Sequence, residues 1–213
     1  MFTGVYTALI TPFNEKGVID WNRLEMQVER QIEAGVDGVV PCGTTGESPT
    51  LTHDEHNDVV DLVVQWVSGR VKVLAGTGSN STHEAREFHQ FAKHHCADGS
   101  LSVVPYYNKP VQAGIVAHFR AVHESALDLP VVLYNIPGRC GVSAHVDTVV
   151  DLANEGTICG LKDATGDLVQ MTDVELGVVN PEFAILSGND DLNLPILWQG
   201  GSGVISVISN AYP

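Results

Sequence analysis

The sequence predicts a single (β/α)8 barrel domain over residues 1–213, with the eighth helix and a C-terminal helical extension missing. Three observations predict it. Short, apolar, β-branched segments recur eight times along the chain, amphipathic helical patterns lie between them, and no long linker interrupts the alternation. Alternation of strands and helices favours a parallel sheet, and eight units favour a closed barrel. A doubly wound open sheet is the alternative, but GTTGES (43–48) matches neither phosphate-binding fingerprint, GxGxxG or GxxxxGK[ST].

The predicted strands are short and apolar throughout, as expected of parallel strands that are covered on both faces. They lie within residues 5–13, 35–43, 71–78, 100–107, 130–137, 157–164, 183–190 and 201–209.

Helical periodicity fills the intervals between these strands. In the first interval, Leu24, Val28 and Ile32 recur four residues apart, and Gly35 follows as the expected C-terminal cap. A valine stripe over 59–67 follows Thr52 and Glu55, and Ser81 and Glu84 have the same capping-box spacing before the third helix. The later stripes are Ala85, Phe88 and Ala92; Ile115, Phe119, Val122 and Ala126; Val146, Val149, Val150 and Ala153; and Met171, Val174 and Val178. The segment near 191–199 is short and poorly patterned.

The C-terminal end departs from the pattern. Barrels of this class typically run to about 250 residues, and this sequence stops at Pro213, just after the eighth strand. We therefore expect a chain shortened at its C-terminus. The outer face of the eighth strand would then need to be covered by another subunit, or it would stay exposed and prone to aggregation.

Composition excludes several classes of function. The net charge of −15 disfavours nucleic acid and anionic membranes as partners. No basic-then-apolar leader precedes Val5, and no uncharged apolar run reaches the ~18 residues of a membrane span. The four cysteines, at 42, 96, 140 and 159, form no CxxC pair. We interpret them as reduced, buried thiols of a cytoplasmic protein.

Polar side chains gather at the predicted strand ends, where barrels of this class place their functional groups. These residues are Thr44, Thr45, Glu47, Tyr106, Tyr107, Tyr134, Asn135, Arg139, Lys162, Asp163, Ser187, Gly188, Asn189 and Asp190. No three of them have the spacing of metal ligands, so we predict no metal site.

Lys162 follows an apolar, glycine-bounded strand, where burial would disfavour its charged form. A neutral amine can attack a carbonyl and form a Schiff base. The alternative is a structural ion pair with Asp163, although adjacent strand residues point to opposite faces. Tyr134 could supply the proton that this chemistry needs, with Thr44 and Tyr107 completing a hydroxyl chain. Both tyrosines could instead only pack and hydrogen-bond outward.

Two further features suit an anionic substrate. The turn GTTGE offers backbone amides and two hydroxyls as a cradle for a small carboxylate, or it is simply a tight turn. Arg139, in PGRCG, is either a bidentate carboxylate clamp or a solvent-exposed charge.

Five stretches together resemble the dihydrodipicolinate synthase family of the class I Schiff-base aldolase superfamily. They are GTTGES (43–48), PYYNKP (105–110), YNIPGRCG (134–141), GLKDATGD (160–167) and GVISV (203–207), and the resemblance extends through essentially all 213 residues. It implies a lyase of lysine biosynthesis by the diaminopimelate route. Pyruvate would condense with L-aspartate 4-semialdehyde to give 4-hydroxy-tetrahydrodipicolinate. It further implies no cofactor and a homodimer or homotetramer.

The resemblance also implies roles for individual residues. Lys162 would form the imine with pyruvate, and Tyr134 would relay protons with Thr44 and with Tyr107 of a neighbouring subunit. The substrate-binding residues would be Thr45 for the pyruvate carboxylate, Arg139 for the semialdehyde carboxylate, and the backbone carbonyls of Gly188 and Ile205. Arg139 favours this activity over that of sialic acid lyases and sugar-acid aldolases, which generally lack an arginine in this loop.

A second, inhibitory site for L-lysine is implied at a subunit interface. Its residues would be Ser48, Pro49, His53, His56, Asn80, Glu84 and Tyr106. Local interpretations compete with it: Glu84 could only close a capping box with Ser81, and His53 and His56 could be solvated.

Two departures from the family pattern leave alternatives open. Cys140 stands where threonine is usual, and full-length relatives continue for about another third of this length. The chain could therefore be an inactive or partner-dependent barrel remnant that binds small carboxylates. It could also be another pyruvate-dependent aldolase of the same superfamily.

Overall fold

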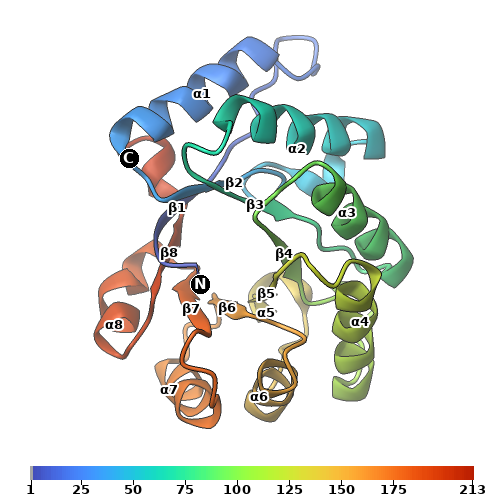
Figure 1. Cartoon of the computed structure of the whole chain (residues 1–213), viewed down its shortest axis with the longest axis vertical. Coiled ribbons are helices and arrows are strands. Elements are labelled where there is room, and N and C mark those ends of the chain that lie inside the picture. Colours follow the sequence, from blue (N-terminus) through green and yellow to red (C-terminus); the bar gives the residue numbers. More distant parts are fainter. Residues whose placement is uncertain (1) are drawn as a thin grey trace.

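The computed structural model describes residues 2–213 and confirms the closed parallel barrel, with strand order β1 to β8 and β8 paired with β1. Helices ring the outside of the strands (Figure 1). The strands are β1 Gly4–Ala8, β2 Gly38–Val40, β3 Lys72–Gly76, β4 Gly99–Val103, β5 Val131–Asn135, β6 Gly160–Asp163, β7 Ala184–Ser187 and β8 Gly203–Ser206. Each lies within one of the eight apolar segments, except that β1 and β4 begin one residue earlier.

The helices occupy the predicted intervals. They are α1 Trp21–Ala34, α2 His53–Val67, α3 Thr82–His94, α4 Gln112–Ser125, α5 Pro137–Cys140, α6 Val146–Asn154, α7 Leu168–Gly177 and α8 Asn193–Trp198. Short 3-10 turns are η1 Ser48–Thr50, η2 Asp190–Leu192 and η3 Ile208–Asn210. No helix between residues 2 and 213 combines the length and the apolar character that crossing a membrane requires.

Helix boundaries follow from capping chemistry. Gly35 ends α1 with φ of 85°, a left-handed conformation that glycine adopts without steric cost. Thr52 and Glu55 form the predicted capping box at the start of α2. Ser81 caps α3 by accepting from the Glu84 amide, but the Glu84 side chain does not return to close a box. That part of the capping prediction is wrong, because the carboxylate has other partners, which are described below.

The buried apolar residues divide into a barrel interior and two layers between strands and helices. The interior includes Tyr6, Leu74, Leu101, Val132 and Leu186. One outer layer packs under α1 and α2, and the other under α4, α6 and α7. Lys162 and Tyr134 therefore lie inside a ring that is insulated from solvent on all sides except the mouth.

Among residues 2–213, a 3-10 turn rather than a helix follows β8, as expected. The turn η3 docks on α1, and Figure 1 places the C-terminal residues beside the end of that helix. Arg30 Nη1 donates to the Asn210 carbonyl at 2.9 Å, and Gln31 Nε2 donates to the Ser209 carbonyl at 3.0 Å. The Ser209 hydroxyl donates to Thr7 Oγ1 on β1 at 2.9 Å. These bonds hold η3 over the junction of β8 and β1, at the carboxyl ends of the strands.

All four cysteines are free thiols. Cys42 and Cys140 are buried and Cys159 is half-buried, but Cys96 is exposed, so the prediction of burial is wrong for it. Cys96 lies in the turn after α3 with φ of 64°.

Candidate active site

Lys162 and Tyr134 face each other inside the barrel. They are direct partners in the pairing of β5 with β6, so both side chains point to the same, interior face. Lys162 is 5% exposed and Tyr134 is 6% exposed. The amine nitrogen lies 4.1 Å from the centre of the tyrosine ring. The structure thus brings the predicted nucleophile and the predicted proton donor into contact.

Burial controls the charge of the lysine. Desolvation lowers the pKa of Lys162 to about 7, and the negative charge of Asp190 partly opposes this shift. A substantial fraction of the amine is therefore uncharged near neutral pH, which is the form that attacks a carbonyl.

The alternative ion pair between Lys162 and Asp163 does not form. Asp163 Oδ1 instead accepts from the backbone amide of Thr165 at 3.0 Å and from its hydroxyl at 2.9 Å. Burial raises the pKa of Asp163, and these two bonds oppose the rise. Asp163 shapes the turn after β6 rather than neutralising the lysine.

Tyr134 is held as a phenol. Burial raises its pKa to about 12, while hydrogen bonding with Thr44 and the charge of Arg139 act to lower it. Tyr134 and Thr44 line the same cavity, so they lie together within one chain, and their partnership in proton transfer stays a prediction. Tyr107 is different: it is 88% exposed and has φ of 69°. Within this single chain, the structure leaves the Tyr107 ring in solvent.

A cavity of about 320 Å³ opens beside Tyr134. Its lining includes Thr44, Arg139 and Cys140 together with Ser48, Pro49 and Tyr106. Lys162 does not line the cavity itself. It contacts Tyr134, which is one of the lining residues. Three residues of the predicted lysine site thus share a cavity with residues of the predicted imine site.

Gly188 brings the loop after β7 against the lysine. A Cβ atom at this position would lie 3.1 Å from Lys162 Cε and 2.9 Å from the Asp163 carbonyl oxygen. Its amide donates to the same carbonyl at 2.6 Å. Glycine is therefore required by this close approach. Ile205 is buried in the barrel interior and pairs with Tyr6.

The turn GTTGE bonds two of its five amides internally. Gly46 and Ser48 donate to the Gly43 carbonyl, and Glu47 donates to the Thr44 carbonyl. The tight turn thus satisfies the amides of Gly46 and Glu47 and that of the following Ser48, and the carboxylate cradle stays a prediction. The amides of Thr44 and Thr45 stand outside these bonds.

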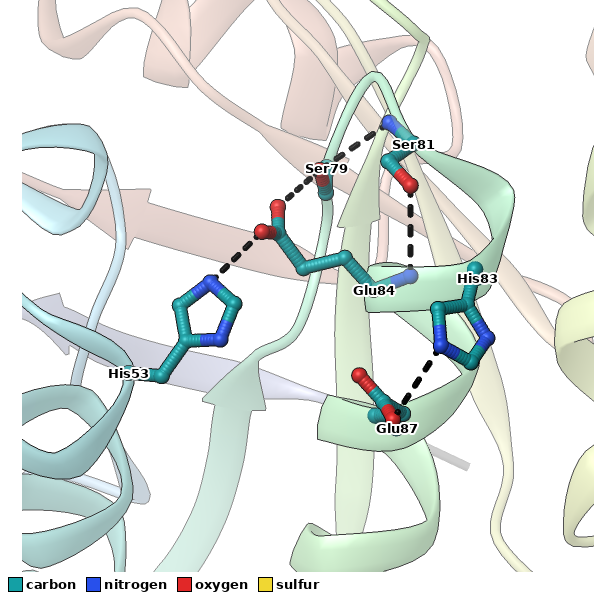
Figure 2. A network of polar contacts seen from close by, with 6 residues as sticks. All are labelled: His53, Ser79, Ser81, His83, Glu84 and Glu87. Carbon is teal, nitrogen blue, oxygen red and sulfur yellow. Dashed lines mark hydrogen bonds and ion pairs between the residues drawn. The ribbon is translucent and has the colours of Figure 1, made fainter.

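A second polar cluster joins α2 to α3. Glu84 Oε1 lies 2.6 Å from His53 Nε2, and Glu84 Oε2 accepts from the hydroxyl of Ser79 (Figure 2). The Ser79 hydroxyl oxygen also accepts from the Ser81 amide at 3.0 Å. The Glu84 side chain therefore links α2 to the loop before α3 and does not close a capping box.

The two histidines of this region have different environments. The His53 side chain is 61% exposed. His56 is buried, with Nε2 2.9 Å from the Gly76 carbonyl and its ring stacked on Phe88 at 3.9 Å between centroids. Burial lowers the pKa of His56, so it is neutral. The interpretation of His56 as solvated is wrong, because α3 packs over that face of α2.

Sequence reasoning missed two contributors. Ser79 carries no sequence signal beyond its place shortly after a strand. Asp190 was noted at a strand end without a role, although its carboxylate accepts from two amides beyond β8. Neither pairing has a local spacing that would reveal it.

Comparison with known proteins identifies relatives over the whole chain. Residues 1–213 match the model of the Dihydrodipicolinate synthetase family. The 4-hydroxy-tetrahydrodipicolinate synthase of Magnetococcus marinus is 51% identical over 213 residues, which is 100% of this chain and 72% of that protein.

Solved structures agree with this match. The dihydrodipicolinate synthase of Aquifex aeolicus superposes with a TM-score of 0.96 at 45% identity, covering 100% of this chain and 72% of that one. The DHDPS of Cyanidioschyzon merolae with lysine bound has a TM-score of 0.95 at 46% identity, covering 98% and 71%.

Proposed function

Because this chain belongs to the dihydrodipicolinate synthetase family, we propose that it condenses pyruvate with L-aspartate 4-semialdehyde through an imine on Lys162. The product would be 4-hydroxy-tetrahydrodipicolinate, in accord with the name of its relative at 51% identity. The observation that carries the proposal is the buried amine of Lys162, with a pKa of about 7 and Tyr134 against it.

The first step follows from the geometry. The neutral Lys162 amine attacks the keto carbon of pyruvate, and the carbonyl oxygen must gain protons to leave as water. Tyr134 is the group placed to pass those protons, since its ring contacts the amine and its phenol is coupled to Thr44. With a raised pKa, Tyr134 serves as a relay for protons and not as a stored anion.

Carboxylate recognition is assigned to groups at the mouth. Arg139 lines the cavity and its guanidinium can bind a carboxylate through two parallel hydrogen bonds. We assign it to the semialdehyde. Thr45, beside the unused turn amides, is assigned to the carboxylate of pyruvate, and the carbonyls of Gly188 and Ile205 to the floor of the site.

We further propose that L-lysine inhibits the enzyme. Ser48, Pro49 and Tyr106 line the shared cavity, and the His53–Glu84 pair lies on the neighbouring helices α2 and α3. The Glu84 carboxylate would suit an ammonium group. Asn80 and His56 complete the proposed set. The relative with lysine bound supports the binding of lysine as such.

A second copy of the chain completes the site in this proposal. The exposed Tyr107 ring, held in a left-handed backbone conformation, would enter the partner's cavity beside Tyr134 and Thr44. A tyrosine 88% exposed in one chain is suited to become buried in an assembly.

Borohydride reduction in the presence of pyruvate tests the proposal. We expect one reduced pyruvate adduct, which peptide mass spectrometry locates at Lys162, and none in Lys162→Ala. A folded protein without an adduct would refute the imine. Turnover of aspartate semialdehyde then separates the synthase from a pyruvate-binding remnant or another aldolase.

A further inference from the structure

Asp190 connects the loop after β7 to the end of β8. Its Oδ2 accepts from the Val207 amide at 2.9 Å and from the Ile208 amide at 3.0 Å. Its Oδ1 accepts from Asn193 Nδ2 at 3.3 Å. Burial acts to raise the pKa of Asp190, but hydrogen bonds from Ser206 and from these amides lower it overall. The carboxylate is therefore ionised at neutral pH.

The segment that Asp190 holds is also held from its other side. Ser209 bonds to Thr7 on β1, and Asn210 Nδ2 donates to the Ala8 carbonyl at 2.7 Å. The end of β8 is thus fixed between β7 and β1. Asp190 supplies the β7 side of that clamp through a charged acceptor, which makes stronger hydrogen bonds than a neutral one.

The same loop lies against the reacting amine. Gly188, two residues before Asp190, approaches Lys162 so closely that a Cβ would sit 3.1 Å from Lys162 Cε. The Tyr134 ring contacts the amine, the charge of Asp190 acts on its pKa, and Arg139 acts on the pKa of Tyr134. Asp190 is the anion among them.

We propose that Asp190 is a positioning residue of the imine site, whose carboxylate ties the end of β8 to the loop after β7 and sets the electrostatic environment of the Lys162 amine. The role in catalysis rests on the function proposed above. The effect on the amine and on the β8 amides does not, and it can be measured without substrate.

Two substitutions separate the effect of the hydrogen bonds to the Val207 and Ile208 amides from the effect of the negative charge of Asp190. Asp190→Asn keeps an oxygen that accepts from both amides but removes the charge. Asp190→Ala removes both. Asp191→Asn is the matched control, because it makes the same charge change one residue along, at an exposed side chain.

The pKa of Lys162 is read directly from its ε-carbon resonance in protein labelled with 13C-lysine. Loss of a nearby anion destabilises the ammonium form of Lys162. We therefore expect the pKa of Lys162 to fall in both Asp190 variants and to stay unchanged in Asp191→Asn. Hydrogen exchange at the Val207 and Ile208 amides should accelerate in Asp190→Ala only. With pyruvate, kcat/KM should fall about tenfold to a hundredfold in Asp190→Ala because the loop shifts.

An unchanged Lys162 resonance in Asp190→Asn, or an equal change in Asp191→Asn, would overturn the electrostatic role. Unchanged exchange at the two amides in Asp190→Ala would overturn the tie. If these shifts occur but the wild-type protein forms no pyruvate adduct, the effect of Asp190 on the Lys162 amine and on the two amides stands, and the proposed function fails.

Discussion

Tyr134 and Lys162 are direct neighbours across the pairing of β5 and β6, with the lysine nitrogen 4.1 Å from the centre of the tyrosine ring. Both side chains point into a closed barrel, and burial moves both pKa values in the direction that favours the uncharged form. The predictions below follow from this pair and from the polar cluster beside it.

Imine formation should depend on pH through Lys162. Its folded pKa of about 7 lies below the ordinary lysine value. The rate of pyruvate capture should therefore rise as pH increases through 7 and level off above it, because only the neutral amine reacts. Borohydride trapping at short times across a pH series measures this. A rate that keeps rising toward pH 10 would indicate an unshifted amine.

Tyr134→Phe should remove the proton relay and leave the barrel intact. We expect the condensation rate to fall about 10²- to 10⁴-fold, the usual contribution of general acid–base catalysis. Steady-state kinetics measures the loss. Tyr6→Phe is the control, since Tyr6 is also buried in the barrel interior but pairs with Ile205 instead of Lys162. Equal losses in both variants would show a packing effect only.

Arg139→Ala should separate the two substrates. Because Arg139 lines the cavity and Lys162 does not, pyruvate adduct formation should survive while kcat/KM for the semialdehyde falls about tenfold or more. Arg139→Lys should restore little, since an ammonium group lacks the planar fork of the guanidinium. A variant that handles both substrates normally would refute the clamp.

Glu84→Gln should weaken inhibition by lysine. Loss of the carboxylate that contacts His53 and Ser79 should raise the inhibitory lysine concentration about tenfold, without lowering uninhibited activity. Glu87→Gln is the matched control: it breaks the exposed His83–Glu87 pair on the same helix (Figure 2). Lysine inhibition curves for the wild-type protein and the two variants measure this. An equal rise of the inhibitory lysine concentration in both variants would contradict a specific site.

Stability should fall in acid because of buried histidines. His89 is neutral, and each of its ring nitrogens makes a hydrogen bond. Nδ1 lies 2.8 Å from the Ser100 hydroxyl, and Nε2 lies 3.2 Å from the Ala126 carbonyl. Burial lowers its pKa from 6.5 to about 4. Above pH 6.5 neither the folded nor the unfolded state binds the proton, so stability is full. As pH falls from 6.5 to about 4, the unfolded state gains the proton first and the free energy of unfolding decreases.

Chemical denaturation at several pH values checks this dependence. His89→Gln should lower stability near neutral pH and flatten its decline in acid. His83→Gln, at a side chain 81% exposed, should leave the pH dependence unchanged. A decline equally steep in His89→Gln would show that other groups cause it.

The eight strands, the α1 stripe of Leu24 and Val28, and the Thr52–Glu55 capping box were predictable because each depends on residues close together in sequence. Local periodicity fixes which face of a strand or helix is apolar. The burial of Lys162 followed in the same way, from its place at the end of an apolar strand in a barrel.

Long-range packing decided the rest. The direct pairing of Tyr134 with Lys162 depends on the register of two strands whose paired positions are 28 residues apart in the sequence. The burial of His56 depends on Phe88 of another helix, and the tie from Asp190 to Val207 depends on how β7 and β8 close. The sequence determined which chemical groups this protein carries at its strand ends. Only the tertiary structure decided which of them meet, because hydrogen bonds and burial between distant segments leave no local pattern.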